Sequence, residues 1–261
     1  MVRGFGGLRF ALSLLFDLTH VMYEFLKNQD KRIADETAGE ENYFYLSPTR
    51  ASLIRKLAPL AEKVIHGRCL DAGAGRMAYA ALLRRCADEY VAMDIEWRPG
   101  SNAAGSALAM PWRDEAFDSV FCSQVLEHVP DPEQALREFF RCLKPGGTIL
   151  VSAPHLSYLH NEPHDYFRYT KHGLRVLLER AGFVEIETAA AGGLLSFLGH
   201  IPSVIAKTVL RPIPLIGRAA MIANGWYSRA VAWIDERVES RKIYALNFIT
   251  AARKPGEAKH E

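Results

Sequence analysis

A short glycine-containing turn, read Arg-Cys-Leu-Asp-Ala-Gly-Ala-Gly-Arg over residues 68–76, constrains this chain more than any other stretch. Cys69 and Leu70 have the character of the end of a short buried strand that follows residues 64–65. Asp71 then places a carboxylate at the carboxyl end of that strand. In an open α/β sheet, ligands bind in the crevice beyond the strand ends, and glycine there permits positive φ and leaves room for the ligand. The turn therefore predicts a nucleotide-type binding site.

The glycine pattern alone leaves the ligand open, because residues 73–78 also fit the dinucleotide fingerprint G-x-G-x-x-G/A. A carboxylate at Asp71 would lie close to a pyrophosphate, which is unfavourable, whereas it suits a ligand with an ammonium or sulfonium group. Residues 90–95 predict a second strand that ends in Asp94, nineteen positions after Gly75. A carboxylate there can accept both hydroxyls of a ribose.

Four further motifs follow at ordered spacing: Gly-Ser-Ala-Leu-Ala-Met-Pro-Trp at 105–112, Phe-Asp-Ser-Val-Phe at 117–121, Gln-Val-Leu-Glu-His-Val at 124–129 and Leu-Lys-Pro-Gly-Gly at 143–147. With these motifs, residues 68–184 resemble the class I S-adenosylmethionine-dependent methyltransferases. The likeness is to the small-molecule type (methyltransferase type 11), which includes ubiquinone and menaquinone biosynthesis enzymes. The resemblance implies an α/β fold with a doubly wound, Rossmann-like sheet of seven strands, the last of them antiparallel.

The resemblance also implies the cofactor, S-adenosyl-L-methionine, and the residues that hold it. These are Asp71, Gly73, Gly75, Asp94, Ile95, Ser106, Ala107 and Gln124. Ser106 departs from the family pattern, which usually has an acid facing the adenine amino group; a serine hydroxyl can still form a hydrogen bond there.

The expected reaction is transfer of a methyl group to an oxygen, nitrogen or carbon atom of a small-molecule, glycan or lipid-linked acceptor. Alignment of donor and acceptor supplies much of the acceleration in such a displacement, so the reaction needs no metal. Three alternatives stay open: a nicotinamide-dependent oxidoreductase, a protein that binds the cofactor without turnover, and a membrane-associated structural protein.

Histidines are the candidates for moving a proton near neutral pH. His128 follows the fourth predicted strand, and His155 and His164 belong to the polar, aromatic stretch 154–170 that leaves the fifth. A structural role for His128, hydrogen-bonded beneath its loop, is the alternative.

The stretch 154–170 is expected to cover the acceptor, and its substrate-binding candidates are Tyr158, His160, Tyr166 and Arg168. An ion pair between Asp165 and Arg168 that braces the loop is the alternative role for Arg168. His160 and His164 have the spacing of a helical metal pair, but Pro163 lies between them, so we expect no metal site.

Overall composition excludes some classes of partner. The net charge of +2 gives no reason to expect nucleic-acid binding, and the four cysteines show no metal-type pairing. Reduced, buried thiols in a cytoplasmic protein are the expectation.

Residues 188–234 contain no acid, and their only Lys and Arg residues are Lys207, Arg211, Arg218 and Arg229, among many apolar side chains. Cationic, apolar helices of this kind are typical of an interfacial membrane anchor or a cover over an apolar substrate. A helical insertion packed on the domain or on a second subunit, as in a homodimer, is the alternative. Residues 1–16 carry Arg3 and Arg9 and no acid, and their apolar run 10–16 is too short to span a bilayer.

Local signals predict several element boundaries. Ser47-Pro48 begins a helix, Thr170 caps another, a helix starts near Met77, and an amphipathic helix covers 132–142. The charged residues 28–42 predict a mobile loop. The predicted division of the chain is an N-terminal helical lid over 1–62, a methyltransferase core over 63–190, an apolar, basic helical insertion over 191–240, a last core strand over 241–253 and a disordered tail over 254–261.

Overall fold

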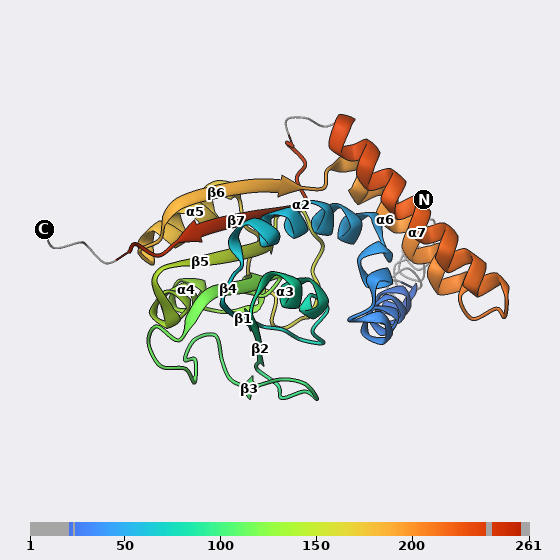
Figure 1. The fold of residues 1–261 in the computed structure, drawn as a ribbon. Coiled ribbons are helices and arrows are strands. Elements are labelled where there is room, and N and C mark those ends of the chain that lie inside the picture. Colours follow the sequence, from blue (N-terminus) through green and yellow to red (C-terminus); the bar gives the residue numbers. More distant parts are fainter. Residues whose placement is uncertain (1–20, 23, 239–241, 257–261) are drawn as a thin grey trace, which may run out of the picture.

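The computed structural model describes residues 21–22, 24–238 and 242–256. Its centre is a seven-stranded sheet with the strand order β3-β2-β1-β4-β5-β7-β6 (Figure 1). The strands are β1 (Arg68–Ala72), β2 (Glu89–Asp94), β3 (Ala103–Ala104), β4 (Phe117–Ser123), β5 (Leu143–Pro154), β6 (Val184–Ala191) and β7 (Asn247–Arg253). β7 runs antiparallel to both of its neighbours, and the remaining pairs are parallel. The predicted fold, including its antiparallel last strand, is confirmed.

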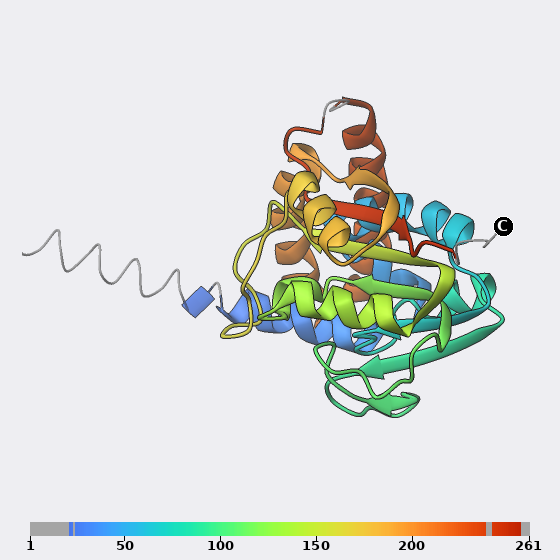
Figure 2. The ribbon, with the colours of Figure 1, turned by 90° about the vertical axis from the view of Figure 1, so that its left-hand side faces the viewer.

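Helices cover both faces of the sheet, as a doubly wound fold requires (Figure 2). The helices are α2 (Pro48–Val64), α3 (Ala80–Cys86), α4 (Pro132–Cys142), α5 (Lys171–Arg180), α6 (Leu194–Leu210) and α7 (Ile216–Val238), with short 3-10 turns η1 (Glu41–Tyr45) and η2 (Leu126–His128). Leu136 and Phe139 of α4 and Leu174 of α5 belong to one buried cluster. Leu57 of α2 and Leu83 of α3 belong to the cluster on the other face.

Three helix starts have the side-chain caps that satisfy otherwise unpaired backbone amides. Ser47 accepts from the amide of Arg50, Asp131 from that of Gln134, and Thr170 from that of Gly173. The predicted caps at Ser47 and Thr170 and the predicted helix 132–142 are therefore confirmed.

Two local predictions were wrong. Residues 28–37 are helical, not a loop, because Ile33 and Ala34 are buried while Asp30 and Glu36 pair with cations of α6 and its C-terminal end. The helix after the glycine turn begins at Ala80, since Met77 adopts a φ of 56° that a helix does not allow.

Helices α6 and α7 form a hairpin beyond one end of the sheet, against α2 and the helical residues 24–37 (Figure 1). No helix within the described residues combines the length and apolar character needed to cross a membrane. The predicted segment 1–16 and residues 257–261 of the predicted tail 254–261 lie outside the described residues. Lys254 of that tail is held in place, because its Nζ atom donates to the carbonyls of Phe140 and Leu143.

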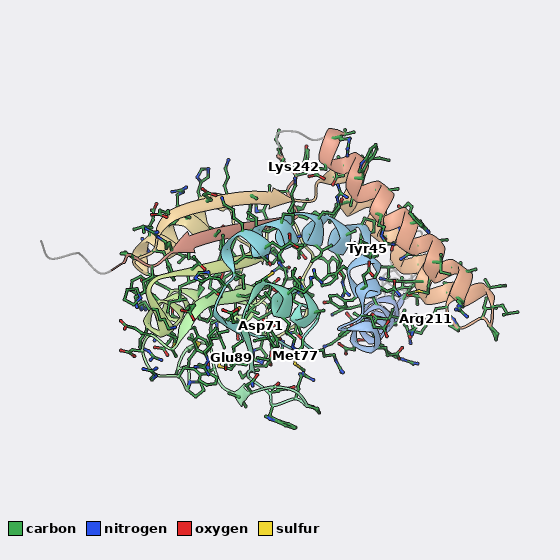
Figure 3. The ribbon with its side chains drawn as sticks, viewed as in Figure 1. Tyr45, Asp71, Met77, Glu89, Arg211 and Lys242 are labelled. Atoms are coloured by element: carbon green, nitrogen blue, oxygen red, sulfur yellow. The ribbon has the colours of Figure 1, made fainter. Side chains whose placement is uncertain are left out.

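Three of the four Lys and Arg residues of 188–234 have partners elsewhere in the protein. Lys207 is buried and pairs with Asp30, and Arg211 donates to Glu36 at 2.6 Å where α6 ends (Figure 3). The guanidinium of Arg229 lies 3.4 Å from the ring centroid of Tyr45. Two of these cations are thus paired with acids of the helix 24–37.

Candidate functional site

The carboxyl ends of β1, β2, β4 and β5 meet along one edge of the sheet, because these strands are parallel neighbours. In doubly wound folds this edge is where ligands bind. The predicted site residues lie on the loops that leave these four strands.

The glycine turn ties β1 to β2. The amides of Gly73 and Ala74 donate to the carbonyl of Met93 at 2.8 and 2.9 Å, and the amide of Gly75 donates to Oδ2 of Asp94 at 2.7 Å. Gly73 has a φ of 81°, and a Cβ there would lie 2.4 Å from Cγ2 of Val125. The turn therefore requires glycine at 73 for both its backbone and the approach of the loop after β4.

Asp71 is the buried carboxylate of this edge (Figure 3). Its side chain is 2 % exposed and accepts a hydrogen bond from the Tyr90 hydroxyl at 2.8 Å. Burial, with a smaller contribution from the charge of Asp94, raises the pKa of Asp71 to about 7. A cation bound nearby would lower that pKa again, because it favours the ionised form.

Asp94 organises the next loop. Its backbone carbonyl accepts from the amide of Gly105 at 2.9 Å, which places Ser106 beside the end of β2. The structure thus brings Gly73, Gly75, Asp94 and the Ser106 loop together, with Asp71 beneath them.

The other predicted cofactor residues are less engaged. Ile95 is exposed, and Ala107 packs against the core. The hydroxyl of Ser106 accepts from the amide of Leu108 at 3.1 Å. Gln124 has a φ of 57°, so the chain turns sharply after β4. Its side-chain amide donates to the hydroxyl of Ser152 at 3.2 Å.

His128 and His160 come together, although they are far apart in sequence. Their rings make an edge-to-face contact with centroids 5.0 Å apart. The Nδ1 atom of His128 lies 2.6 Å from the carbonyl oxygen of His164. Burial, the largest influence, lowers the pKa of His128, and the nearby His160 lowers it further. These effects outweigh the hydrogen bond to the His164 carbonyl, which raises the pKa, so the neutral imidazole is favoured.

Glu127 is a site residue that the sequence analysis did not identify, although it stands inside a quoted motif. Its side chain is fully buried, and neither carboxylate oxygen has a hydrogen-bond partner among the described residues. Burial raises its pKa to about 8. Oε1 of Glu127 lies 3.7 Å from Nε2 of His128. An unpartnered buried carboxylate is rare enough to indicate a ligand or a functional role.

The stretch 154–170 is braced internally. Arg168 donates to both carboxylate oxygens of Asp165, at 2.6 and 2.8 Å, and to the carbonyl of Tyr158 at 2.7 Å. This is the predicted ion pair. Arg168 lowers the pKa of Asp165 through these hydrogen bonds.

The remaining candidates of this stretch lie near one another without sharing one contact. The ring of His155 packs on Phe248 of β7, with centroids 5.3 Å apart. Nδ1 of His164 lies 2.9 Å from the hydroxyl of Tyr166. Tyr158 is 6.3 Å from His160 and 6.1 Å from His200 between ring centroids, so it connects the loop to α6.

Arg50 extends this edge toward the helical cover. Its Nη1 atom is excluded from solvent without a hydrogen-bond partner among the described residues, and its guanidinium lies 4.5 Å from the ring centroid of Tyr43. The charge of Arg50 also acts on Tyr79, which follows the glycine turn, and on Tyr158. No motif marks Arg50, because its environment comes from four separate parts of the chain.

Comparison with known proteins places this edge in a family. Residues 70–151 match the family described as a methyltransferase domain. This stretch of the chain is therefore similar to methyltransferase domains. That matched range holds Asp71, both turn glycines, Asp94 and the Glu127–His128 pair.

Curated relatives of this chain are also named as methyltransferases. An uncharacterized methyltransferase of Mycobacterium sp. (strain JLS) is 31% identical over 122 residues, which cover 42% of this chain and 48% of that protein. A demethylmenaquinone methyltransferase of Streptomyces griseus is 42% identical over 55 residues, 21% of this chain and 23% of that protein. The chain thus spans about half or less of the length of the curated relatives it matches.

Solved structures share the fold of the methyltransferase domain. A SAM-dependent methyltransferase from Archaeoglobus fulgidus has a TM-score of 0.52 at 17% identity, covering 78% of this chain and 92% of that one. The [4+2]-cyclase SpnF has a TM-score of 0.50 at 21% identity, covering 77% and 80%. Because a protein named as a cyclase has the same fold, function must be argued from the residues of the site.

Proposed function

We propose that this protein binds S-adenosyl-L-methionine and transfers its methyl group to a small-molecule, glycan or lipid-linked acceptor. The observation that carries the proposal is the carboxylate of Asp94 at the end of β2, held against the glycine turn by the amide of Gly75. A carboxylate in this position accepts ribose hydroxyls. A Cβ at Gly75 would meet nothing within 4 Å, so space is open above the turn.

The charges of the edge support the sulfonium cofactor over a dinucleotide. Asp71 and Asp94 place two carboxyl groups at this edge; burial is the main cause of the raised pKa of Asp71, and the charge of Asp94 adds to it. A pyrophosphate would add negative charge to this pair, whereas a ligand with ammonium and sulfonium groups would neutralise it. Bound S-adenosylmethionine supplies a methyl group activated on sulfur.

The residues of this chain contribute binding and orientation. We assign Asp94 to the ribose, Ser106, Ala107 and Ile95 to the adenine side, Gln124 to the loop that faces the ligand, and Asp71 to the cationic end. Tyr158, His160, Tyr166 and Arg168 are assigned to the acceptor side, where Arg168 acts by fixing the loop through Asp165. His128, His155 and His164 are the candidates to influence proton removal from a hydroxyl acceptor.

Isothermal titration calorimetry tests the cofactor. We expect S-adenosylmethionine and its demethylated product to bind, and NAD not to bind. Consumption of the donor in the presence of a lipid extract then separates an enzyme from a non-catalytic binding protein. Binding of NAD in preference to S-adenosylmethionine would instead support an oxidoreductase.

For the α6–α7 hairpin we propose contact with a membrane surface or an amphiphilic acceptor. Support comes from a stripe of exposed apolar side chains on α6, Leu198, Ile201, Ile205 and Val209, at helical spacing. Leu215, between the helices, is 90% exposed. Since Lys207, Arg211 and Arg229 are engaged internally, insertion of apolar side chains is the driving force, and charge contributes little.

Co-sedimentation with anionic and neutral vesicles distinguishes the occupants of this surface. We expect binding to both vesicle types with little dependence on salt, and its loss in Ile201→Asp. Absence of vesicle binding together with a dimer in solution would make the hairpin a subunit interface. The proposed location is the cytoplasm, peripheral to a membrane, and the four free cysteines support a reducing compartment.

A further inference from the structure

Three side chains converge on one point between the loop after β4 and the loop after β5. Glu127, His128 and His160 each offer a ligand atom, and these atoms lie within 4.8 Å of one another. The carboxylate is fully buried and both of its oxygens lack partners among the described residues, as noted above. The proposed methyl transfer leaves this cluster without an assigned ligand.

The hydrogen bonds around the cluster determine where the histidine protons lie. Nδ1 of His128 is 2.6 Å from the carbonyl oxygen of His164, and a carbonyl only accepts. Nδ1 of the neutral ring therefore carries the hydrogen, and Nε2 presents a lone pair toward Oε1 of Glu127 at 3.7 Å. That separation is too long for a hydrogen bond, so a shared proton does not account for the pair.

His160 is oriented in the same way. Its Nδ1 lies 3.2 Å from the carbonyl oxygen of Tyr158 and 3.6 Å from Oδ2 of Asp165, both of which are acceptors. Arg168 also approaches this nitrogen at 3.4 Å, but its shorter bonds go to Tyr158 and Asp165. The second nitrogen of His160 is therefore the one available to a ligand.

We propose that Glu127, His128 and His160 form a binding site for a divalent transition-metal ion, with Zn²⁺ as the reference ion. Two imidazoles and one carboxylate are a known ligand set for zinc and for iron(II). Ligating histidines commonly donate their other ring N–H to a backbone carbonyl or a carboxylate. Both histidines here have that arrangement.

The dimensions require only small side-chain adjustment. With metal–ligand bonds of about 2.1 Å, two ligands of one ion lie at most about 4.2 Å apart. The 3.7 Å between Glu127 and His128 meets that limit, and a rotation of His160 would bring in the third ligand. Three protein ligands leave at least one coordination position for water or for an oxygen atom of an acceptor.

The charges nearby are compatible with a cation. Arg168, whose positive charge acts on Glu127, is neutralised by its bidentate contact with Asp165. Asp165 adds negative charge next to His160. The site differs from the His160–His164 pair considered in the sequence, because His164 contributes only its backbone carbonyl and its ring contacts Tyr166.

The test uses the tag-free full chain, stripped with a chelator and titrated with Zn²⁺ and with Mn²⁺ by calorimetry. We expect one equivalent of Zn²⁺ to bind with micromolar affinity or better. Glu127→Gln and His160→Asn should each weaken binding by at least about 100-fold, since loss of a ligand should cost at least as much as loss of a supporting contact. His172→Asn, an exposed histidine on α5, is the matched control and should bind like the parent.

Cobalt(II) substitution gives a second measurement that does not depend on methyl transfer. A visible absorption band in the parent, lost in Glu127→Gln while the thermal unfolding midpoint is retained, supports the site. Absence of binding to the parent, or equal affinity in the parent, Glu127→Gln and His160→Asn, overturns it. Binding of S-adenosylmethionine to the chelator-treated protein tests the proposed function separately, so the two can fail independently.

Discussion

The two halves of the site edge are built in opposite ways. On the β1–β2 side, the contacts that shape the turn join residues about twenty positions apart, such as the amide of Gly75 and the carboxylate of Asp94. On the β4–β5 side, the contacts join distant segments, such as His128 with His164 and Tyr158 with His200. The first half is a local backbone motif, and the second is an assembly of side chains.

That difference explains how each half can vary. A backbone turn that holds a ligand tolerates few substitutions, because its geometry depends on positive φ and on close approach. An assembly of side chains on loops and added helices can change its residues while the sheet stays the same. We therefore expect the β1–β2 half to bind the common cofactor and the β4–β5 half, with Arg50 and α6, to select the acceptor.

The largest effect should follow from Gly73→Val. Its Cβ would lie 2.4 Å from Cγ2 of Val125, and a β-branched residue is strained at the φ of 81°. We expect S-adenosylmethionine affinity to fall by at least about 100-fold, equivalent to about 2.7 kcal/mol, a loss within the range of overpacking costs. Calorimetry on the folded variant measures it.

Gly146→Val is the matched control for Gly73→Val. Gly146 has a similar φ of 79°, but a Cβ there meets nothing within 4 Å and the residue lies at the opposite end of β5. We expect it to lose stability while retaining cofactor affinity. Equal loss of affinity in both variants would show that the glycine turn has no special role in binding.

Asp94→Ala should give the next largest effect. If both ribose hydroxyls bond to this carboxylate, the loss is about 1.5–3 kcal/mol, or roughly 10–100-fold in affinity. Glu96→Ala, an exposed carboxylate on the same loop, is the control and should change affinity little. Parent-like binding by Asp94→Ala would place the cofactor elsewhere and remove the proposed contrast between the halves.

Asp71 should make cofactor binding depend on pH. Its pKa of about 7 in the free protein means that it is partly protonated at neutral pH, and a cationic ligand favours the ionised form. Affinity should therefore rise with pH up to about 7, by at most about tenfold per pH unit, and then level off. Asp71→Asn should remove this dependence, while the titration of the ligand's own amino group persists as a common background.

The same raised pKa fixes the sign of the stability effect. Between the ordinary carboxyl pKa of 3.8 and the folded value of about 7, the folded protein holds a proton that the unfolded chain has released. The contribution of Asp71 to stability is therefore complete below pH 3.8 and is lost as pH rises through 7. A denaturation series of parent and Asp71→Asn across this window measures it, and parallel curves would contradict the assignment.

The sequence predicted the turn between β1 and β2 because its signals are local. Gly73, Gly75 and Asp94 stand at a spacing that the turn itself imposes, and helix caps such as Thr170 act within three residues. The charged stretch 28–42 was mistaken for a loop because its partners are distant in sequence. Lys207 and Arg211 each lie more than 170 positions from the acid that they pair with. Composition of one segment cannot show that a distant segment neutralises it.

The β4–β5 half was predicted residue by residue but not as an arrangement. Glu127 was passed over because burial of a carboxylate depends on tertiary packing that no short motif reveals. The alternative role considered for Arg168, as the partner of Asp165, was correct. This pair could be predicted because the two residues are three positions apart. The meeting of His128 with His160 was not foreseen, because it depends on how two loops close on each other.

The smallest effect should come from the candidate histidines outside the proposed metal site. His155 follows β5 directly and packs on Phe248, and its ring nitrogens form no hydrogen bond within the described residues. His164 is exposed and contacts Tyr166 through Nδ1.

Once an acceptor is found, we expect His155→Gln to lower the rate by about tenfold or less, because alignment of donor and acceptor supplies most of the acceleration. A positioned base in an acceptor-side role would instead contribute about 100-fold or more. Of these two candidates, we expect the acid limb of the pH–rate profile to change in His155→Gln and to stay like the parent's in His164→Gln. A change in His164→Gln alone would move proton removal to the loop, and unchanged profiles in both would show that the β4–β5 half acts by positioning the acceptor.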